Sequence, residues 1–240
     1  MYHLTSKANK GLATHQGLDL MGCRLADEIY EWLLGICQET GNESTDIYLS
    51  IVGHSLGGLI AQFAINLLFP PADAPPLSEE TKKSIRSLEE KTGIKITPCS
   101  FTTLCTPHLG ARKPPAPNSF YSLLQNKVIM STATMFLGKT GSELMLTDGP
   151  LEDSMIFKLS KPEYKRLENW TCTSFSCLWH DIPVGFTSAA FGDHPYVDAS
   201  FDKSYLPPNT FVIHDYLSPS TKASGKEAVL EVRARFLFHF

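Results

Sequence analysis

A glycine-rich turn, Gly53-His54-Ser55-Leu56-Gly57-Gly58, joins an apolar run at residues 47–52 to an apolar stretch with helical spacing at residues 59–68. The first run is typical of a buried strand. The second, which ends at Phe69-Pro70-Pro71, is typical of a helix. A strand, a tight Gly-x-Ser-x-Gly turn and a helix are the context of a nucleophile elbow. The sequence therefore predicts that Ser55 projects from a sharp turn at the end of a strand.

Two glycines flank this serine. Gly53 and Gly57, two residues before and after Ser55, are expected to let backbone segments cross closely, because glycine has no Cβ. The N-terminus of the following helix carries unpaired N–H groups, so the N–H of Leu56 is a candidate oxyanion donor. The alternative is a turn with an incidental serine, because a bare Gly-x-Ser-x-Gly arises by chance in roughly one in ten chains of this length.

Length and composition restrict the remaining possibilities. A chain of 240 residues suits one sizeable α/β domain and is too short for two full ones, so we expect a single domain over 1–240. The net charge of −4 and the lack of a basic run give no argument for nucleic-acid binding. The six cysteines show no metal-ligand spacing beyond an isolated C-x4-C. We expect no metal and no organic cofactor, because the chemistry of a serine nucleophile needs only proton transfer and oxyanion stabilisation. Reduced thiols without a secretory signal favour a cytoplasmic protein.

Hydrophobic spacing predicts further elements on both sides of the turn. These are a helix at 22–37, a solvated surface helix at 78–91, strands at 100–104 and 170–175, and a last strand at 229–238.

The segment at 112–150 stands apart from these elements. It opens with the proline-rich run 113–117 and continues into a mostly uncharged, apolar stretch at 120–137. Inserted between two core strands, this stretch predicts either a core helix pair or a movable lid over an acyl site. The residues alone favour neither interpretation.

A serine nucleophile requires a base that removes its proton and an acid that orients the base. In α/β-hydrolases the order along the chain is serine, then acid, then histidine. Asp181 fits as the acid, because it follows the strand-like run at 170–175. Asp148 competes with it, since it also ends an apolar run. For either residue the alternative is a loop aspartate that caps a helix or turn.

The base is harder to assign. We expect His54 to pack against a neighbouring loop, and His108 to be structural because it precedes both acids. The histidines after Asp181 are His194, His214 and His239. His214, expected in a loop at 212–215, is the candidate base, with a surface histidine as the alternative. No histidine follows the last expected strand, although a hydrolase base belongs in the loop beyond it.

Several motifs resemble those of a known family. Besides the Ser55 turn they are Thr14-His15-Gln16-Gly17-Leu18-Asp19, Phe101-Thr102-Thr103-Leu104, Thr106-Pro107-His108-Leu109-Gly110 and Thr140-Gly141. Over about residues 14–200 the chain is similar to the lipase-like "putative serine esterase" family of the α/β-hydrolase superfamily. The resemblance implies a mostly parallel sheet flanked by helices. It also implies hydrolysis of acyl-lipid esters, with Ser55 as nucleophile and Asp181 as orienting acid.

The chain departs from the family pattern in two places. Members begin with a strand ending in a His-Gly motif, which supplies the second oxyanion N–H, and carry their histidine in a loop after the last strand. We expect both to be missing here, as in a chain truncated at both ends. The sheet would then lack its N-terminal strands and the loop after the last strand.

Two main functions remain open. One is a lipase- or phospholipase-like ester hydrolase that forms an acyl-serine intermediate, and the other is a catalytically impaired module that binds lipid or protein. A different acyl transfer, such as thioester or peptide hydrolysis, is a third. The apolar stretch at 120–137 suggests peripheral contact with a membrane or lipid-droplet surface.

Overall fold

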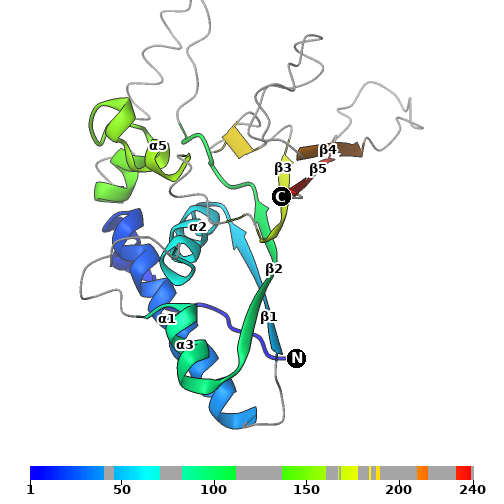
Figure 1. The fold of residues 1–240 in the computed structure, drawn as a ribbon. Coiled ribbons are helices and arrows are strands. Elements are labelled where there is room, and N and C mark those ends of the chain that lie inside the picture. The colour runs from blue at the N-terminus through cyan, green and yellow to red at the C-terminus, as the bar shows by residue number, and fades with distance from the viewer. Residues whose placement is uncertain are drawn as a thin grey trace, which may run out of the picture.

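The computed structural model of the chain describes ten ranges. They are residues 1–40, 46–70, 83–111, 137–160, 167, 169–177, 184 and 188–189, together with the backbone of 210–215 and 231–238. Within these ranges the chain forms a sheet of five strands with helices packed against it (Figure 1). The predicted α/β fold is confirmed.

Three strands form the parallel part of the sheet: β1 (Asp46–His54), β2 (Lys95–Leu104) and β3 (Thr171–Cys177). The register pairs His54 with Leu104, and Leu104 with Phe175. The carboxyl ends of the three strands therefore lie side by side, at the edge where parallel α/β sheets usually place their ligands.

The remaining strands extend the sheet in the antiparallel sense. β5 (Glu231–Phe238) pairs with β3, and β4 (Thr210–Asp215) pairs with β5, so the strand order is β1-β2-β3-β5-β4. β5 confirms the last predicted strand. The predicted loop at 212–215 is wrong, because these residues belong to β4 and the backbone of His214 is paired with Ala234.

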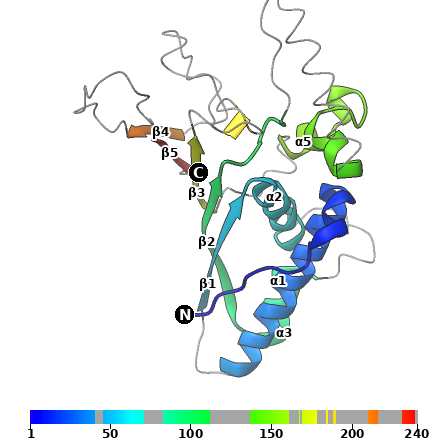
Figure 2. The same ribbon diagram turned by 180° about the vertical axis from the view of Figure 1, so that it is seen from behind.

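Helices α1 (Leu18–Thr40), α2 (Leu56–Leu68) and α3 (Ile85–Thr92) lie on the same face of the sheet, as both views show (Figures 1 and 2). Along β1 the residues of one face are buried or half-buried, whereas Tyr48 and Val52 on the other face are 69% and 67% exposed. None of the helices in the described ranges has the length and apolarity needed to span a bilayer.

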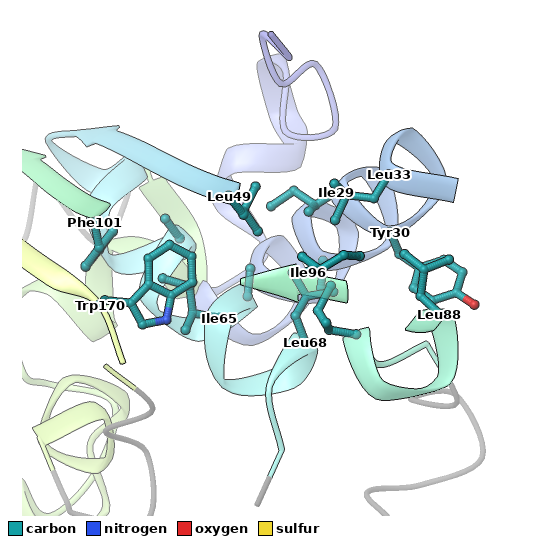
Figure 3. Packing of buried hydrophobic residues seen from close by; sticks show 14 of the residues in the cluster. Ile29, Tyr30, Leu33, Leu49, Ile65, Leu68, Leu88, Ile96, Phe101 and Trp170 are labelled. Atoms are coloured by element: carbon teal, nitrogen blue, oxygen red, sulfur yellow. The ribbon is translucent and has the colours of Figure 1, made fainter. Parts of the chain in front are cut away.

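The main core lies between these helices and the sheet (Figure 3). Buried residues at helical spacing on α1, such as Ile29 and Leu33, meet Ile65 and Leu68 of α2. Full burial of a side chain of this size stabilises the fold by about 1.5–3 kcal/mol. Trp170 closes the cluster, 2% exposed and edge-on to the ring of Phe69.

Local signals explain where α3 begins and ends. Ser84 and Ser87 form a reciprocal capping box at its start, and Gly93 closes it in the left-handed conformation. The helix predicted at 78–91 thus begins later, at Ile85, and residues 78–82 of the prediction lie outside the described residues. The prediction of a solvated surface helix is incomplete, because one face of α3 carries Ile85 and Leu88, which are buried in the core.

Shorter elements complete the described chain. A 3-10 helix, η1 (Gly11–His15), precedes α1, and α1 itself is longer than the predicted 22–37. Residues 137–144 are helical, and η4 (Leu151–Asp153) leads into α5 (Met155–Ser160).

Candidate active site

Ser55 is the single residue between the end of β1 and the start of α2. Its backbone has φ 50° and ψ −128°, a conformation that costs a residue with a side chain of order 1–3 kcal/mol. The N–H of Ser55 donates to the carbonyl of Leu104 at 2.8 Å, which ties the turn to the end of β2. The predicted sharp turn at Ser55 is therefore present, with β1 before it and α2 after it.

Two glycines make this turn sterically possible. A Cβ on Gly53 would lie 2.5 Å from the Cα of Gly58, and a Cβ on Gly58 would lie 2.1 Å from Oγ1 of Thr106. A Cβ on Gly57 would have no described atom within 4 Å. The prediction was right for Gly53 and wrong for Gly57, because the close approach on the helical side falls at Gly58, one residue later.

The side chain of Ser55 is not used to cap α2. A serine at the N-cap position ordinarily accepts a hydrogen bond from the first turn of the helix, but Ser55 makes no such side-chain bond. Ser55 is half-buried, and Leu56 is the first residue of α2. The N–H of a first helical residue has no partner within the helix, so Leu56 can donate to an oxygen placed beside Oγ of Ser55.

Residues 105–110, which follow β2, pack directly behind this turn, and we call them the 105–110 loop. Thr106 is fully buried against Gly58, and its Oγ1 has no hydrogen-bond partner among the described residues. The N–H of Cys105 donates to the carbonyl of Phe175 at 2.8 Å, just as Ser55 bonds back to β2. The loop therefore joins the Ser55 turn to the end of β3.

His108 of this loop belongs to a buried hydrogen-bonded chain. Ser174 Oγ donates to the carbonyl of Ala189 at 2.9 Å, and Thr103 Oγ1 donates to Ser174 Oγ at 3.1 Å. Thr103 Oγ1 then accepts from Nε2 of His108 at 3.1 Å, which assigns the proton of the ring to Nε2.

Burial lowers the pKa of His108 to about 3, so the ring is neutral near pH 7. A neutral ring with Nε2 committed to Thr103 matches the structural role expected for His108.

Within the described part of the chain, no hydrogen bond joins Ser55 to any of the other histidines. His54 is exposed, although it was expected to pack against a loop. The backbone of His214 lies in β4. His194, His239 and the candidate acid Asp181 lie outside the described residues, so their predicted roles stay predictions.

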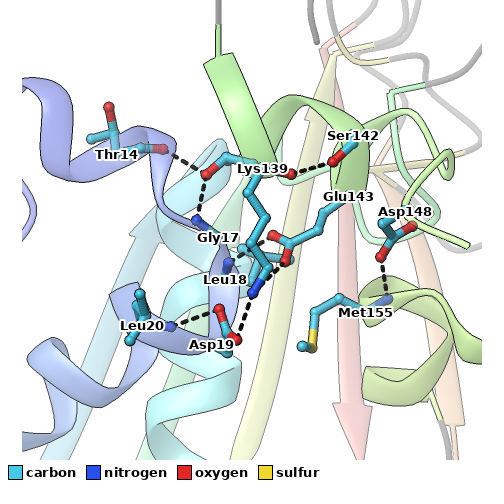
Figure 4. Close-up of polar contacts among 11 residues, drawn as sticks. Thr14, Gly17, Leu18, Asp19, Leu20, Lys139, Ser142, Glu143, Asp148 and Met155 are labelled. Carbon is cyan, nitrogen blue, oxygen red and sulfur yellow. Dashed lines mark hydrogen bonds and ion pairs between the residues drawn. The ribbon is translucent and has the colours of Figure 1, made fainter.

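Asp148, the competing acid, has a local partner. Its Oδ2 accepts the backbone N–H of Met155 at 2.8 Å, at the start of α5 (Figure 4). This is the capping role that the sequence offered as the alternative for a loop aspartate.

The end of the predicted 112–150 insertion is fixed to the start of α1 (Figure 4). Thr140 Oγ1 accepts the N–H of Gly17 at 3.0 Å and donates to the carbonyl of Thr14 at 2.7 Å. Glu143, 1% exposed, accepts the N–H of Leu18 at 2.7 Å. Two of the sequence motifs thus meet in space, while residues 112–136 lie outside the described residues.

A cavity of about 330 Å³ lies at the opposite end of the sheet from Ser55, where α2 ends and β2 begins. Its lining includes Leu68, Phe69, Ile96 and Trp170. It is therefore separate from the Ser55 turn.

Sequence reasoning missed the polar residues behind the turn. Thr103 lies two residues after Phe101 on the buried face of β2. Ser174 likewise lies two residues after Cys172 on the buried face of β3. A hydroxyl in such an alternating pattern is the signal that could have identified them, because buried polar groups are nearly always hydrogen-bonded.

Comparison with known protein families gives a match over most of the chain. The model of a family described as "Putative serine esterase (DUF676)" matches residues 1–176. No curated protein and no solved structure matched the chain.

Proposed function

The chain belongs to the "Putative serine esterase (DUF676)" family, and on that premise we propose that it hydrolyses acyl-lipid esters through an acyl intermediate on Ser55. Oγ of Ser55 attacks the ester carbonyl, a base takes its proton, and the alcohol leaves carrying a proton. Water then cleaves the acyl-serine ester and releases the acid. Asp181 remains the proposed acid. His214 remains the proposed base, and it would act on Ser55 from strand β4 and not from the loop that the sequence predicted.

The observation that carries the proposal is the backbone of Ser55. A strained conformation persists only where the surrounding structure enforces it, and such residues gather at functional sites. Here Gly53, Gly58 and the bond to Leu104 enforce it. An ordinary helix cap would need no such strain, and its serine side chain would accept a hydrogen bond from the first turn of the helix, which Ser55 does not.

The position of Leu56 supports the same chemistry. Its N–H, at the positive end of α2, would face the oxygen of a tetrahedral intermediate. A donor of this kind contributes about 2.7–4 kcal/mol of transition-state stabilisation.

The lipid part of the proposal depends on the apolar stretch at 120–137. This stretch would contact a lipid surface and bring acyl chains to Ser55. Shortening it should then reduce hydrolysis of an emulsified lipid more than hydrolysis of a short soluble ester. Equal losses on both substrates would remove the lipid part and leave a general esterase.

One observation favours a second candidate function, a module of this fold that binds lipid or protein without turnover. Within the described ranges no histidine engages Oγ of Ser55, and His108 directs Nε2 to Thr103. A chain that binds a fluorescent acyl lipid but does not hydrolyse soluble esters would have this second function.

The test compares two serines of the same strand region. Ser55→Ala removes the proposed nucleophile, and Ser50→Ala makes the same change at an exposed position of β1. We expect the chain to hydrolyse p-nitrophenyl butyrate, Ser50→Ala to keep that activity, and Ser55→Ala to lose about 10³-fold or more. A wild-type chain without activity, or an active Ser55→Ala variant, would refute the proposal.

A further inference from the structure

Thr106 packs on the first turn of α2. The residue is fully buried, and its side-chain atoms Oγ1, Cγ2 and Cβ lie 2.1, 2.6 and 2.8 Å from the position that a Cβ of Gly58 would take. Gly53 of β1 approaches the same glycine, because a Cβ on Gly53 would lie 2.5 Å from the Cα of Gly58. Gly58 is therefore contacted both by β1 and by the 105–110 loop, and close packing leaves it little room to move.

The loop that carries Thr106 is itself anchored on both sides of this residue. Before Thr106, the N–H of Cys105 donates to the carbonyl of Phe175 in β3 at 2.8 Å. After it, Oγ of Ser188, a residue that is 8% exposed, donates to the carbonyl of Gly110 at 2.6 Å. Water competes little for such a buried bond. Thr106 is therefore held in place from β3 and from Ser188.

Gly58 in turn fixes the peptide group that follows Ser55. Its N–H donates to the carbonyl of Ser55 at 3.1 Å, which closes the first turn of α2. That carbonyl and the N–H of Leu56 belong to the same peptide group, which is planar and trans, so the two point in opposite directions. A bond that fixes the carbonyl of Ser55 therefore also fixes the direction in which the N–H of Leu56 points.

We propose that Thr106 is a positioning residue, which holds Gly58 in place and so aims the N–H of Leu56 at the oxyanion. This inference rests on the proposed function, with Ser55 as nucleophile and Leu56 as oxyanion donor. Thr106 touches no substrate in this assignment and acts through the backbone alone. An oxyanion donor is effective at about 2.7–3.1 Å from the developing charge, so a rotated peptide group slows the reaction and leaves substrate binding unchanged.

The test compares two substitutions of Thr106 in the 240-residue chain and measures turnover per active site. Titration with a fluorophosphonate counts the sites in which Ser55 reacts. Steady-state hydrolysis of p-nitrophenyl butyrate then gives KM and kcat per site.

Thr106→Ala removes Oγ1 and Cγ2 and leaves Gly58 room to move. We expect kcat per site to fall about tenfold, with KM within about twofold. The loss is smaller than the roughly 10²–10³-fold of a deleted donor, because the N–H of Leu56 remains and only its direction changes.

Thr106→Val keeps the branched shape and loses only the hydroxyl. Oγ1 of Thr106 has no hydrogen-bond partner among the described residues, so valine breaks no bond recorded there. If packing on Gly58 is the contact that matters, Thr106→Val should keep kcat per site within about twofold of wild type.

Thr140→Ala is the matched control. Thr140 is also fully buried, and its Oγ1 accepts the N–H of Gly17 and donates to the carbonyl of Thr14 at the start of α1. The same substitution there should lower the melting temperature at least as much, because it breaks two hydrogen bonds, and should keep kcat per site. A purely structural role of Thr106 would make the two alanine variants alike, with fewer titratable sites and unchanged turnover at each.

If Thr106→Ala does not fold, Thr106→Ser carries the test. It removes Cγ2 alone, so we expect a smaller loss of kcat per site, about threefold, with KM again unchanged.

Three results would overturn the inference and leave the proposed function intact. They are wild-type kcat per site in the folded variant that carries the test, an equal loss in Thr106→Val, and an equal loss in Thr140→Ala. A folded wild-type chain without Ser55-dependent hydrolysis would overturn the proposed function, and the inference with it.

Discussion

At the scale of single residues, the site depends on contacts that leave no space for one more carbon atom. Gly53 and Gly58 approach each other across the turn, and Thr106 fills the space against Gly58. The strained φ of Ser55 and the absence of Cβ atoms beside it are therefore two parts of one geometry. Substitutions here should separate the glycines that are sterically required from the one that is not.

Gly58→Ala should destabilise the fold by about 3 kcal/mol, the upper end of the range for overpacking. The added Cβ would lie 2.1 Å from Oγ1 of Thr106, which is buried and cannot move into solvent. Gly57→Ala, one residue earlier on the same helix, should leave the free energy of unfolding unchanged or slightly higher, because alanine favours helix. Urea denaturation of both variants measures the difference, and equal stability of the two would contradict the packing described.

His108 should make stability depend on pH. Burial lowers its pKa to about 3 in the folded chain from an ordinary 6.5, so the unfolded chain takes up a proton at a higher pH than the folded chain. The contribution of His108 to the free energy of unfolding is complete above about pH 6.5. It is lost as the pH falls towards 3, by about 1.4 kcal/mol per pH unit.

Between pH 7 and pH 5 the wild-type chain should therefore lose about 2 kcal/mol more of its unfolding free energy than His108→Gln. Parallel pH profiles for the two proteins would show that the folded chain protonates His108 as readily as the unfolded chain does.

At the scale of elements, the start of α1 is completed by a residue from far along the chain. Glu143, in the helical residues 137–144, accepts the N–H of Leu18, one of the first N–H groups of α1. Burial raises the pKa of Glu143, while the bond from Leu18 and the charge of Lys139 oppose that rise. Lys139 also pairs with Asp19 at 2.7 Å, so this contact joins the two helices independently of Glu143.

Glu143→Ala should cost about 1–3 kcal/mol, because it leaves the buried N–H of Leu18 without an acceptor. Glu143→Gln keeps an acceptor and removes the charge. Since the folded-state pKa is raised, the wild-type residue adds most stability below pH 4.5 and loses it as the pH rises through the raised value.

Glu143→Gln should therefore be at least as stable as wild type at pH 7 by thermal unfolding. A Gln variant as unstable as the Ala variant would show instead that the carboxylate charge is required.

Much of this element structure could be predicted, for reasons that particular residues make clear. The spacing of Ile29, Leu33 and Ile36 and the run before Gly53 are local patterns, and α1 and β1 follow them. The contact of Glu143 with Leu18 spans 125 residues, and no local pattern encodes it. The requirement for glycine at position 58, where the sequence had predicted position 57, also has no local pattern behind it. It arises because a Cβ at Gly58 would collide with Thr106, which is distant in the sequence and adjacent in space.

At the scale of the whole molecule, one sheet with helices on one face places the Ser55 turn. Three parallel strands end side by side, and the loops after β1 and β2 meet at that edge, where Ser188 also attaches. The composition of the chain and the order of its expected strands and helices predicted an α/β fold. The antiparallel strand β4 was not predicted, because its six residues hold the polar pair His214 and Asp215 and resemble a loop.

The most direct measurement is a map of the residue that reacts with a fluorophosphonate probe. Such a probe phosphonylates a serine only where its hydroxyl is activated and the developing oxyanion is stabilised. Digestion of the labelled chain and tandem mass spectrometry should place the adduct on Ser55, with no adduct on Ser50 of β1. A folded chain that stays unlabelled at Ser55, or carries the adduct on another serine, would contradict the account.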